Sequence, residues 1–251
     1  LAISGLTVFA LEQTDEGVRK PAQVEMLLNL PLLGFTPQVE GRFIEEMRDT
    51  KSHIFDAYFS IRSSLAFSTS HGFPRSLAVL STRPAEGKSW TSSALAVVLG
   101  RTDKRVLLVD GDLRSPSIHN NMGLPNDRGL SNYLAGDEVI ATSIHETEFK
   151  NVYAMPAGPV PPSAAELLSG DRLGLFMEEA LKNFDHVIID SAPVLGMTDG
   201  PTIAKSVEGV IYVVESTGPA VRGVRASINR VRQVGAHIFG VVLTKVKLKQ
   251  G

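Results

Sequence analysis

From Ser76 onward the chain alternates between short apolar runs and stretches with helical spacing. The apolar runs carry hydrophobic residues at nearly every position, which is typical of strands buried on both faces of a sheet. These predicted strands cover residues 77–80, 106–109, 152–155, 186–189, 209–214 and 238–243. Helices are predicted between them at residues 90–99, 173–183, 202–206 and 221–234. This alternation predicts an α/β fold with a parallel sheet flanked by helices on both faces, and such sheets bind ligands at the carboxyl ends of their strands.

Residues 52–67 precede the sheet and have a different pattern. Their apolar positions are spaced by three and four, and Ser52 stands where its side chain can cap the first turn. We therefore predict an amphipathic helix that begins the main domain, residues 52–251, and packs one face against it.

The first 51 residues read as a separate N-terminal part. Residues 12–51 are predicted to form an arm, with a short helix at 22–28 after Pro21 and an extended segment beyond it. Residues 1–11 are uncharged and mostly apolar, but a bilayer-spanning helix needs about 20 residues. The pattern alone leaves two interpretations open: a buried segment, or one end of a transmembrane helix.

Composition narrows the possible functions. The 251 residues carry a formal net charge of −2, so nothing favours a nucleic-acid partner or an anionic membrane surface overall. The absence of cysteine excludes disulfides, thiolate zinc sites and cysteine nucleophiles. The six histidines stand singly, without the spacing of metal ligands, and are expected to be structural or surface residues.

The first strand of the predicted sheet leads into a polar loop, residues 82–89 (TRPAEGKS), and then into a helix. The last three loop positions match the P-loop pattern G-x-x-x-x-G-K-[ST]. Gly87 would let the backbone approach phosphates, Lys88 would reach the β- and γ-phosphates, and Ser89 would ligate Mg²⁺. A bare G-K-S occurs often by chance, but the strand before it and the helix after it favour a P-loop NTPase fold with ATP and Mg²⁺ as cofactors. The residues expected around the nucleotide are Thr82, Arg83, Pro84, Ala85, Glu86, Gly87, Lys88, Ser89 and Trp90.

Two further predicted strands end in acidic residues. Asp110 and Asp112 follow strand 106–109 at positions i and i+2, so both can face the same side. Such a pair suits one carboxylate on a metal and another that polarises an attacking hydroxyl or water. Asp190 ends strand 186–189 in the form of a Walker B motif, whose carboxylate contacts Mg²⁺ directly or through water. Together with the P-loop, these residues predict a nucleotide site at the carboxyl edge of the sheet.

Several ordered motifs resemble those of the bacterial tyrosine kinases (BY-kinases) of capsule and exopolysaccharide export. Asp110-x-Asp112-x-Arg114 is similar to the Walker A′ motif of that family, and it accompanies S-T-R-P-A-E-G-K-S and I-I-D-S-A-P-V-L. Residues 129–134 (GLSNYL) and 161–168 (PPSAAELL) are similar to its G-L-S-x-Y-L and P-P-N-P-x-E-L-L. Residues 18–34 resemble the segment that links the second transmembrane helix of a polysaccharide copolymerase to its kinase domain.

The resemblance implies a deviant-Walker ATPase-like fold and an ATP-dependent protein tyrosine autokinase that regulates polymer export. The γ-phosphate would go to tyrosines, chiefly in a C-terminal cluster of a neighbouring subunit. Asp110 would activate the tyrosine hydroxyl and Lys88 would stabilise the transferring phosphoryl group. Ser89 and Asp112 would hold Mg²⁺, and Asp190 would support the metal and its waters.

The resemblance also implies a location and partners. Residues 1–11 would be the end of a transmembrane helix and residues 12–51 a juxtamembrane linker. The chain would then be the cytoplasmic portion of a bacterial inner-membrane protein. Implied partners are other copies of the chain in a ring or dimer, the copolymerase membrane segment in cis, and a protein tyrosine phosphatase.

Three departures from the family pattern stand out. The oligomerisation motif E-x-x-R-x-x-R falls on Asp56-x-x-Phe59-x-x-Arg62, without the middle arginine. Ala94 and Thr244 replace family asparagines, and neither is expected to touch the phosphate machinery. No tyrosine cluster is present; the four tyrosines are scattered through predicted helices and strands, where packing explains them: Tyr58, Tyr133, Tyr153 and Tyr212.

Two other functions stay open. One is a deviant-Walker ATPase that acts as a dimerisation switch, although such proteins carry a lysine early in the loop, where this chain has Arg83. The other is a non-catalytic nucleotide-sensing assembly module, favoured by the altered ring motif. The basic end of the chain, Lys245, Lys247 and Lys249, is expected to be solvated, and it would also suit a membrane surface.

Overall fold

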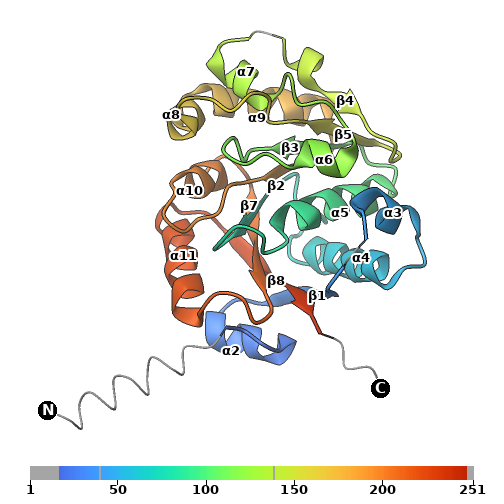
Figure 1. Ribbon diagram of the computed structural model, residues 1–251, viewed down its shortest axis with the longest axis vertical. Coiled ribbons are helices and arrows are strands. Elements are labelled where there is room, and N and C mark those ends of the chain that lie inside the picture. Colours follow the sequence, from blue (N-terminus) through green and yellow to red (C-terminus); the bar gives the residue numbers. More distant parts are fainter. Residues whose placement is uncertain (1–16, 40, 138, 248–251) are drawn as a thin grey trace, which may run out of the picture.

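The computed structural model describes residues 17–39, 41–137 and 139–247. Within them, eight strands form one sheet in the order β1-β8-β7-β2-β6-β3-β5-β4 (Figure 1), parallel throughout except for the β4–β5 pair. The strands are β1 (Leu32–Pro37), β2 (Ser76–Ser81), β3 (Val106–Asp110), β4 (His145–Glu146), β5 (Val152–Met155), β6 (His186–Asp190), β7 (Gly209–Glu215) and β8 (Ile238–Val246). The α/β fold and all six predicted strands are thereby confirmed.

Helices cover both faces of the sheet (Figure 1). Those with residues in the core on one face are α3 (Phe43–Arg48), α4 (His53–Ala66), α5 (Lys88–Gly100) and α6 (Ile118–Met122). The core on the other face takes residues from α2 (Val24–Leu28), α7 (Leu130–Ala135), α8 (Ala164–Ser169), α9 (Arg172–Asn183), α10 (Asp199–Ala204) and α11 (Val221–Gln233). Short 3₁₀ helices lie at Pro21–Gln23 and Ile140–Ser143.

The four central residues of strand β2 are all apolar, and the structure explains why. Leu77 and Val79 belong to the core under α4 and α5, whereas Ala78 and Leu80 belong to the opposite core. Successive side chains of a strand point to opposite faces, so the middle of a strand covered on both sides is apolar at successive positions.

Helix α4 forms as its spacing predicts. The Ser52 hydroxyl accepts a hydrogen bond from the Phe55 amide at 3.2 Å, which caps the first turn. Ile61 and Leu65 are fully buried on its inner face, while Phe59 on the outer face is 47% exposed. The helix packs on β1 and α5, so it covers the P-loop helix from outside.

The extended segment of the arm becomes part of the sheet. It forms β1, the edge strand, which pairs in parallel with β8. Short α2 lies beside α11 on one face of the sheet. Residues assigned to an arm thus complete the main sheet, and the division of the chain at residue 52 stays a prediction.

No helix in the described part of the chain has the length and apolar character needed to cross a bilayer. Residues 1–11, predicted to end a transmembrane helix, lie outside the described residues.

Candidate nucleotide and phosphotransfer site

The predicted motifs meet at one edge of the sheet. Strands β2, β6 and β3 are adjacent, and their carboxyl ends carry the P-loop, Asp190 and Asp110 respectively. A cavity of about 360 Å³ opens beside them. Seven predicted site residues line this cavity: Pro84, Ala85, Gly87, Lys88, Ser89, Trp90 and Asp112. The sequence analysis did not assign the other lining residues to the site: Arg114, Ser115, Ser117, Pro193 and Met197.

The P-loop backbone turns through two left-handed residues. Ala85 has φ 63° and Gly87 has φ 90°. A Cβ atom at Gly87 would lie 3.3 Å from the Thr244 side chain, so both conformation and space favour glycine there. Helix α5 begins directly afterwards, at Lys88, and its first unpaired N–H groups form an anion-binding helix start.

Side chains from outside the motif hold this loop in shape. The Thr244 hydroxyl donates to the Glu86 carbonyl at 2.6 Å, and Lys245 Nζ donates to the Ala85 carbonyl at 2.7 Å. Lys245 also pairs with Glu215 at 2.9 Å. The expectation that Thr244 lies away from the phosphate machinery is therefore wrong. Lys245 contacts the loop, although its end of the chain is partly solvated as expected, with Lys247 exposed. The position of Thr244 and Lys245 at the end of the last strand was the available signal, because all parallel strands end at this edge.

Lys88 is the cation at the centre of the site. Its ammonium lies 2.9 Å from Asp190 Oδ1 and 3.8 Å from Asp112 Oδ2, and it donates to the Ser89 hydroxyl at 3.3 Å. The side chain is 6% exposed. A buried lysine between two carboxylates is held in one place, facing the loop that would carry phosphates.

Asp110 occupies a different environment from Asp112. It is fully buried, and its oxygens accept hydrogen bonds from the amides of Asp112, Ser117 and Ile118. Burial and the neighbouring Asp190 raise the pKa of Asp110 to about 7. Asp110 does not line the cavity, so the structure places it behind Asp112, where it fixes the loop leading to α6.

Asp110 and Asp190 are partners in register across β3 and β6, and the chain that leaves β3 stays close to the end of β6. The Gly111 amide donates to the Asp190 carbonyl at 2.7 Å. A Cβ atom at Gly111 would lie 2.8 Å from that same carbonyl oxygen, so only glycine allows the close approach.

The carboxylates and the Ser89 hydroxyl fit a magnesium ion. Asp190 Oδ2 is buried without a hydrogen-bond partner, and burial raises the pKa of Asp190 while Lys88 opposes that shift. Asp112 Oδ2 contacts only Lys88 among the described groups. Magnesium takes one or two carboxylates and completes its shell with water and phosphate oxygens. Within the described residues, no three or more His, Cys, Asp or Glu side chains gather as possible metal ligands. A site with only two carboxylates and a hydroxyl is compatible with that finding.

Arg114 links the site to α10. Its guanidinium makes two hydrogen bonds to the fully buried carboxylate of Asp199, at 2.7 and 3.2 Å. This bidentate pair fixes the loop after Asp112 against the helix that follows the Walker B turn. Asp199 begins a helix instead of ending a strand, so a search for strand-end acids does not find it.

The remaining predicted residues lie around the cavity without lining it. Thr82 is buried and its hydroxyl lies 3.0 Å from the Tyr212 hydroxyl. Arg83 is exposed on the loop, and its amide donates to Glu86 Oε2. Glu86 is 1% exposed, and burial raises its pKa to about 7. Trp90, which does line the cavity, also packs edge-to-face on Phe43, with ring centroids 5.0 Å apart.

The four tyrosines serve packing. Tyr58, Tyr133 and Tyr212 are at most 6% exposed, and the Tyr58 hydroxyl lies 3.1 Å from the Thr91 hydroxyl. Tyr153 packs edge-to-face against Phe184.

Comparisons with known proteins agree with this geometry. Residues 75–242 match a family described as an AAA domain. The protein named putative tyrosine-protein kinase CapB, of Staphylococcus aureus, is 31% identical over 79% of this chain and 87% of its own. Tyrosine-protein kinase wzc of Salmonella typhimurium is 33% identical over 76% of this chain, but this chain spans only 27% of that protein. The kinase domain of Escherichia coli tyrosine kinase ETK superimposes with a TM-score of 0.85, covering 94% of this chain and 97% of that one at 28% identity. The chain therefore belongs to the bacterial tyrosine-protein kinase family and carries that family's P-loop domain.

Proposed function

We propose that this chain is an ATP-dependent protein tyrosine kinase that transfers the γ-phosphoryl group of Mg-ATP to tyrosine. The observation that carries the proposal is the placement of Lys88, 2.9 Å from Asp190 and 3.8 Å from Asp112, at the start of the P-loop helix. This arrangement puts one fixed cation and two metal-seeking carboxylates where a terminal phosphate would lie.

The residues of the site would divide into phosphate-binding, metal-binding and positioning groups. The Gly87 turn and the first amides of α5 would bind the phosphates, and Lys88 would stabilise charge on the transferring group. Ser89, Asp112 and Asp190 would hold Mg²⁺, which when bound neutralises phosphate charge. We assign Asp110 a positioning role, because its oxygens already accept three backbone hydrogen bonds.

The acceptor tyrosine would come from elsewhere than the packed tyrosines described above. The cavity is also lined by the buried Pro193 and the half-buried Met197, an apolar wall suited to an aromatic ring. We therefore propose that a tyrosine of another segment, or of another copy of the chain in a ring or dimer, enters along this wall.

By its resemblance, the chain would be the cytoplasmic portion of an inner-membrane protein that regulates exopolysaccharide export. The arm-like residues 18–34 support this proposal. A copolymerase membrane segment in cis and a tyrosine phosphatase would be its partners.

The test is phosphate transfer from Mg-ATP to a tyrosine-rich peptide supplied in trans, followed with a phosphotyrosine antibody and mass spectrometry. We expect Lys88→Met to lower the rate by roughly a hundred- to a thousandfold, because a preorganised charge at the phosphoryl group is lost. Lys205→Ala, which removes an exposed lysine at the end of α10, is the matched control and should keep the rate.

Hydrolysis of ATP without phosphotyrosine, on the peptide or on the chain, would contradict the kinase proposal and favour the dimerisation-switch ATPase. Nucleotide binding without any turnover would favour the non-catalytic assembly module.

A further inference from the structure

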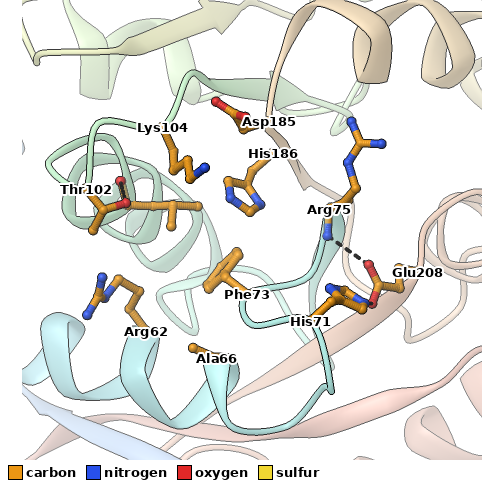
Figure 2. Close-up of a pocket in the computed structure, with 11 residues that line it drawn as sticks. Arg62, Ala66, His71, Phe73, Arg75, Thr102, Lys104, Asp185, His186 and Glu208 are labelled. Carbon is orange, nitrogen blue, oxygen red and sulfur yellow. Dashed lines mark hydrogen bonds and ion pairs between the residues drawn. The ribbon is translucent and has the colours of Figure 1, made fainter.

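A second cavity lies at the opposite end of the same strands, and Figure 2 shows the side chains around it. Its volume is about 540 Å³. Arg75 immediately precedes β2, Asp185 precedes β6 and Glu208 precedes β7, while Lys104 lies two residues before β3. We call it the amino-end pocket. It shares no lining residue with the nucleotide site, which opens at the carboxyl ends of the strands.

Two cations in this pocket have neither an anionic partner nor a backbone carbonyl partner among the described residues. Lys104 is exposed, and no hydrogen bond or ion pair joins it to another described residue. Arg62 reaches the pocket from α4; its guanidinium lies over the Phe59 ring and donates to the Ser63 hydroxyl at 3.3 Å. Arg62 Nε is buried and lacks any partner within the described part of the chain.

The acidic residues of the pocket are already engaged. Glu208 accepts the Arg75 amide at 2.8 Å, a contact drawn in Figure 2, and pairs with His71 at 2.9 Å. Asp185 Oδ2 accepts the Arg105 amide at 2.8 Å. Counting Arg62, Arg75 and Lys104 against Asp185 and Glu208, with the histidines neutral, the pocket carries a net formal charge of +1.

The pocket floor is apolar and aromatic. Phe73 and His186 meet edge-to-face with ring centroids 5.3 Å apart, and both face the hollow in Figure 2. The His186 Nδ1 atom lies 2.9 Å from the Pro74 carbonyl, which can only accept, so this nitrogen carries the proton and Nε2 has a free lone pair. Leu99 and Ala66 add apolar surface.

One feature of the fold acts against an anion here. Helices α4, α5 and α9 end on this side of the sheet, and helix carboxyl ends carry partial negative charge. Arg75 offsets part of this negative charge, since its guanidinium donates to the Leu181 carbonyl. Within the described residues, Arg62 and Lys104 make no such carbonyl contact, so Arg62 Nε and the Lys104 ammonium remain available to an anion.

We propose that the amino-end pocket binds a phosphate monoester carried on a small aromatic or apolar group. The phosphate oxygens would accept from Arg62 Nε and from the Lys104 ammonium, and the carrier group would cover Phe73, His186 and Leu99. The same chemistry is offered by a phosphorylated tyrosine side chain and by a free small phosphate ester. The proposal does not depend on the kinase activity proposed above.

The test is calorimetric titration of the full chain with phenyl phosphate, in saturating Mg-ADP so that the nucleotide site is filled. We expect binding that Lys104→Ala and Arg62→Ala each weaken by roughly tenfold or more, the loss of one charge-assisted contact. Lys205→Ala is the matched control and should bind as the unchanged chain does. Absence of binding, or binding that neither substitution weakens, would overturn the proposal.

Two further ligands test the carrier group and the source. Inorganic phosphate should bind more weakly than phenyl phosphate, and equal affinity would overturn the assigned role of the apolar floor. A phosphotyrosine peptide that binds more tightly than phenyl phosphate would support a polypeptide source, whereas weaker binding of the peptide would support a small phosphate ester.

Discussion

Buried ionisable groups lie at both ends of strands β2, β6 and β3, and burial shifts their pKa values in opposite directions at the two ends. At the carboxyl end, Asp110, Asp190 and Glu86 are acids whose pKa values burial raises. At the amino end, His186 is a base whose pKa burial lowers. In each case the low-polarity interior disfavours the charged form.

The two ends also differ in how charge is balanced. At the carboxyl end Lys88 sits among carboxylates, so the acids outnumber the cation. At the amino end the acids accept backbone amides, and among the described residues Arg62 and Lys104 have no anionic partner. By our proposals, one sheet offers a metal and phosphate site at one end and an anion-binding pocket at the other. The predictions below are ordered by expected effect and each probes one side of this contrast.

The largest effect is expected within the carboxyl end, from Asp112→Asn. Asp112 lines the cavity and its Oδ2 faces Lys88, so its loss should raise the Mg²⁺ concentration needed for half-maximal phosphotransfer by roughly ten- to a hundredfold. Magnesium titrations of the transfer rate measure this shift. Thermal stability should change little, because the Ser115 amide can still donate to the remaining oxygen.

Asp110→Asn is the comparison for that experiment. Asp110 accepts three backbone amides and lies behind the cavity, so we expect stability and rate to fall together with no change in the magnesium requirement. A stable Asp110→Asn protein with a greatly reduced rate would instead support Asp110 as the group that activates the tyrosine hydroxyl.

These two aspartates also show what the sequence could and could not predict. The apolar runs identified the strands, and because parallel strands end at one edge, the P-loop, Asp110 and Asp190 could be brought together without coordinates. The i, i+2 spacing suggested that Asp110 and Asp112 face the same way. In the structure β3 ends at Asp110, so the strand alternation stops there and Asp112 faces the cavity alone.

Other features depend on long-range contacts that spacing does not encode. Helices α6, α7 and α8 have only five or six residues each, too few for a helical period to appear. The support of the P-loop by Thr244 and Lys245 depends on β8 lying beside β7, a strand order that the chain sequence leaves open. The amino-end pocket likewise gathers Arg62, Lys104 and His186 from three distant segments.

A smaller effect is expected from Glu86→Gln, through the pH dependence of folding. The pKa of Glu86 is raised from 4.5 to about 7, so the folded state favours the protonated acid. Its contribution is complete below pH ~4.5 and is lost as pH rises to about 7, a loss of roughly 2–3 kcal/mol. Relative to the unchanged chain, Glu86→Gln should therefore gain stability between pH 4 and pH 8 in urea unfolding. The exposed Glu178→Gln is the control, and a Glu86→Gln difference that stays flat with pH would contradict the assignment.

The smallest effect, and the opposite sign, is expected at the amino end from His186→Asn. Burial lowers the pKa of His186 below 6.5; Lys104 and Arg75 add to that lowering, while the Pro74 contact and Asp185 oppose it. The unfolded chain therefore takes up a proton first, and stability is lost as pH falls below ~6.5. Asparagine can still donate to the Pro74 carbonyl but does not titrate, so His186→Asn should lessen the acid-side loss in urea unfolding at pH 5 and pH 7.

The exposed His53→Asn serves as the control for that loss. If the His186 and Glu86 substitutions shift the pH profile of stability in the same direction, the buried groups at the two ends of the sheet do not have opposite effects on the pH dependence of folding. If the shifts are opposite, a variant with both changes should show each effect in its own pH range, because the two side chains lie at opposite ends of the strands and share no partner.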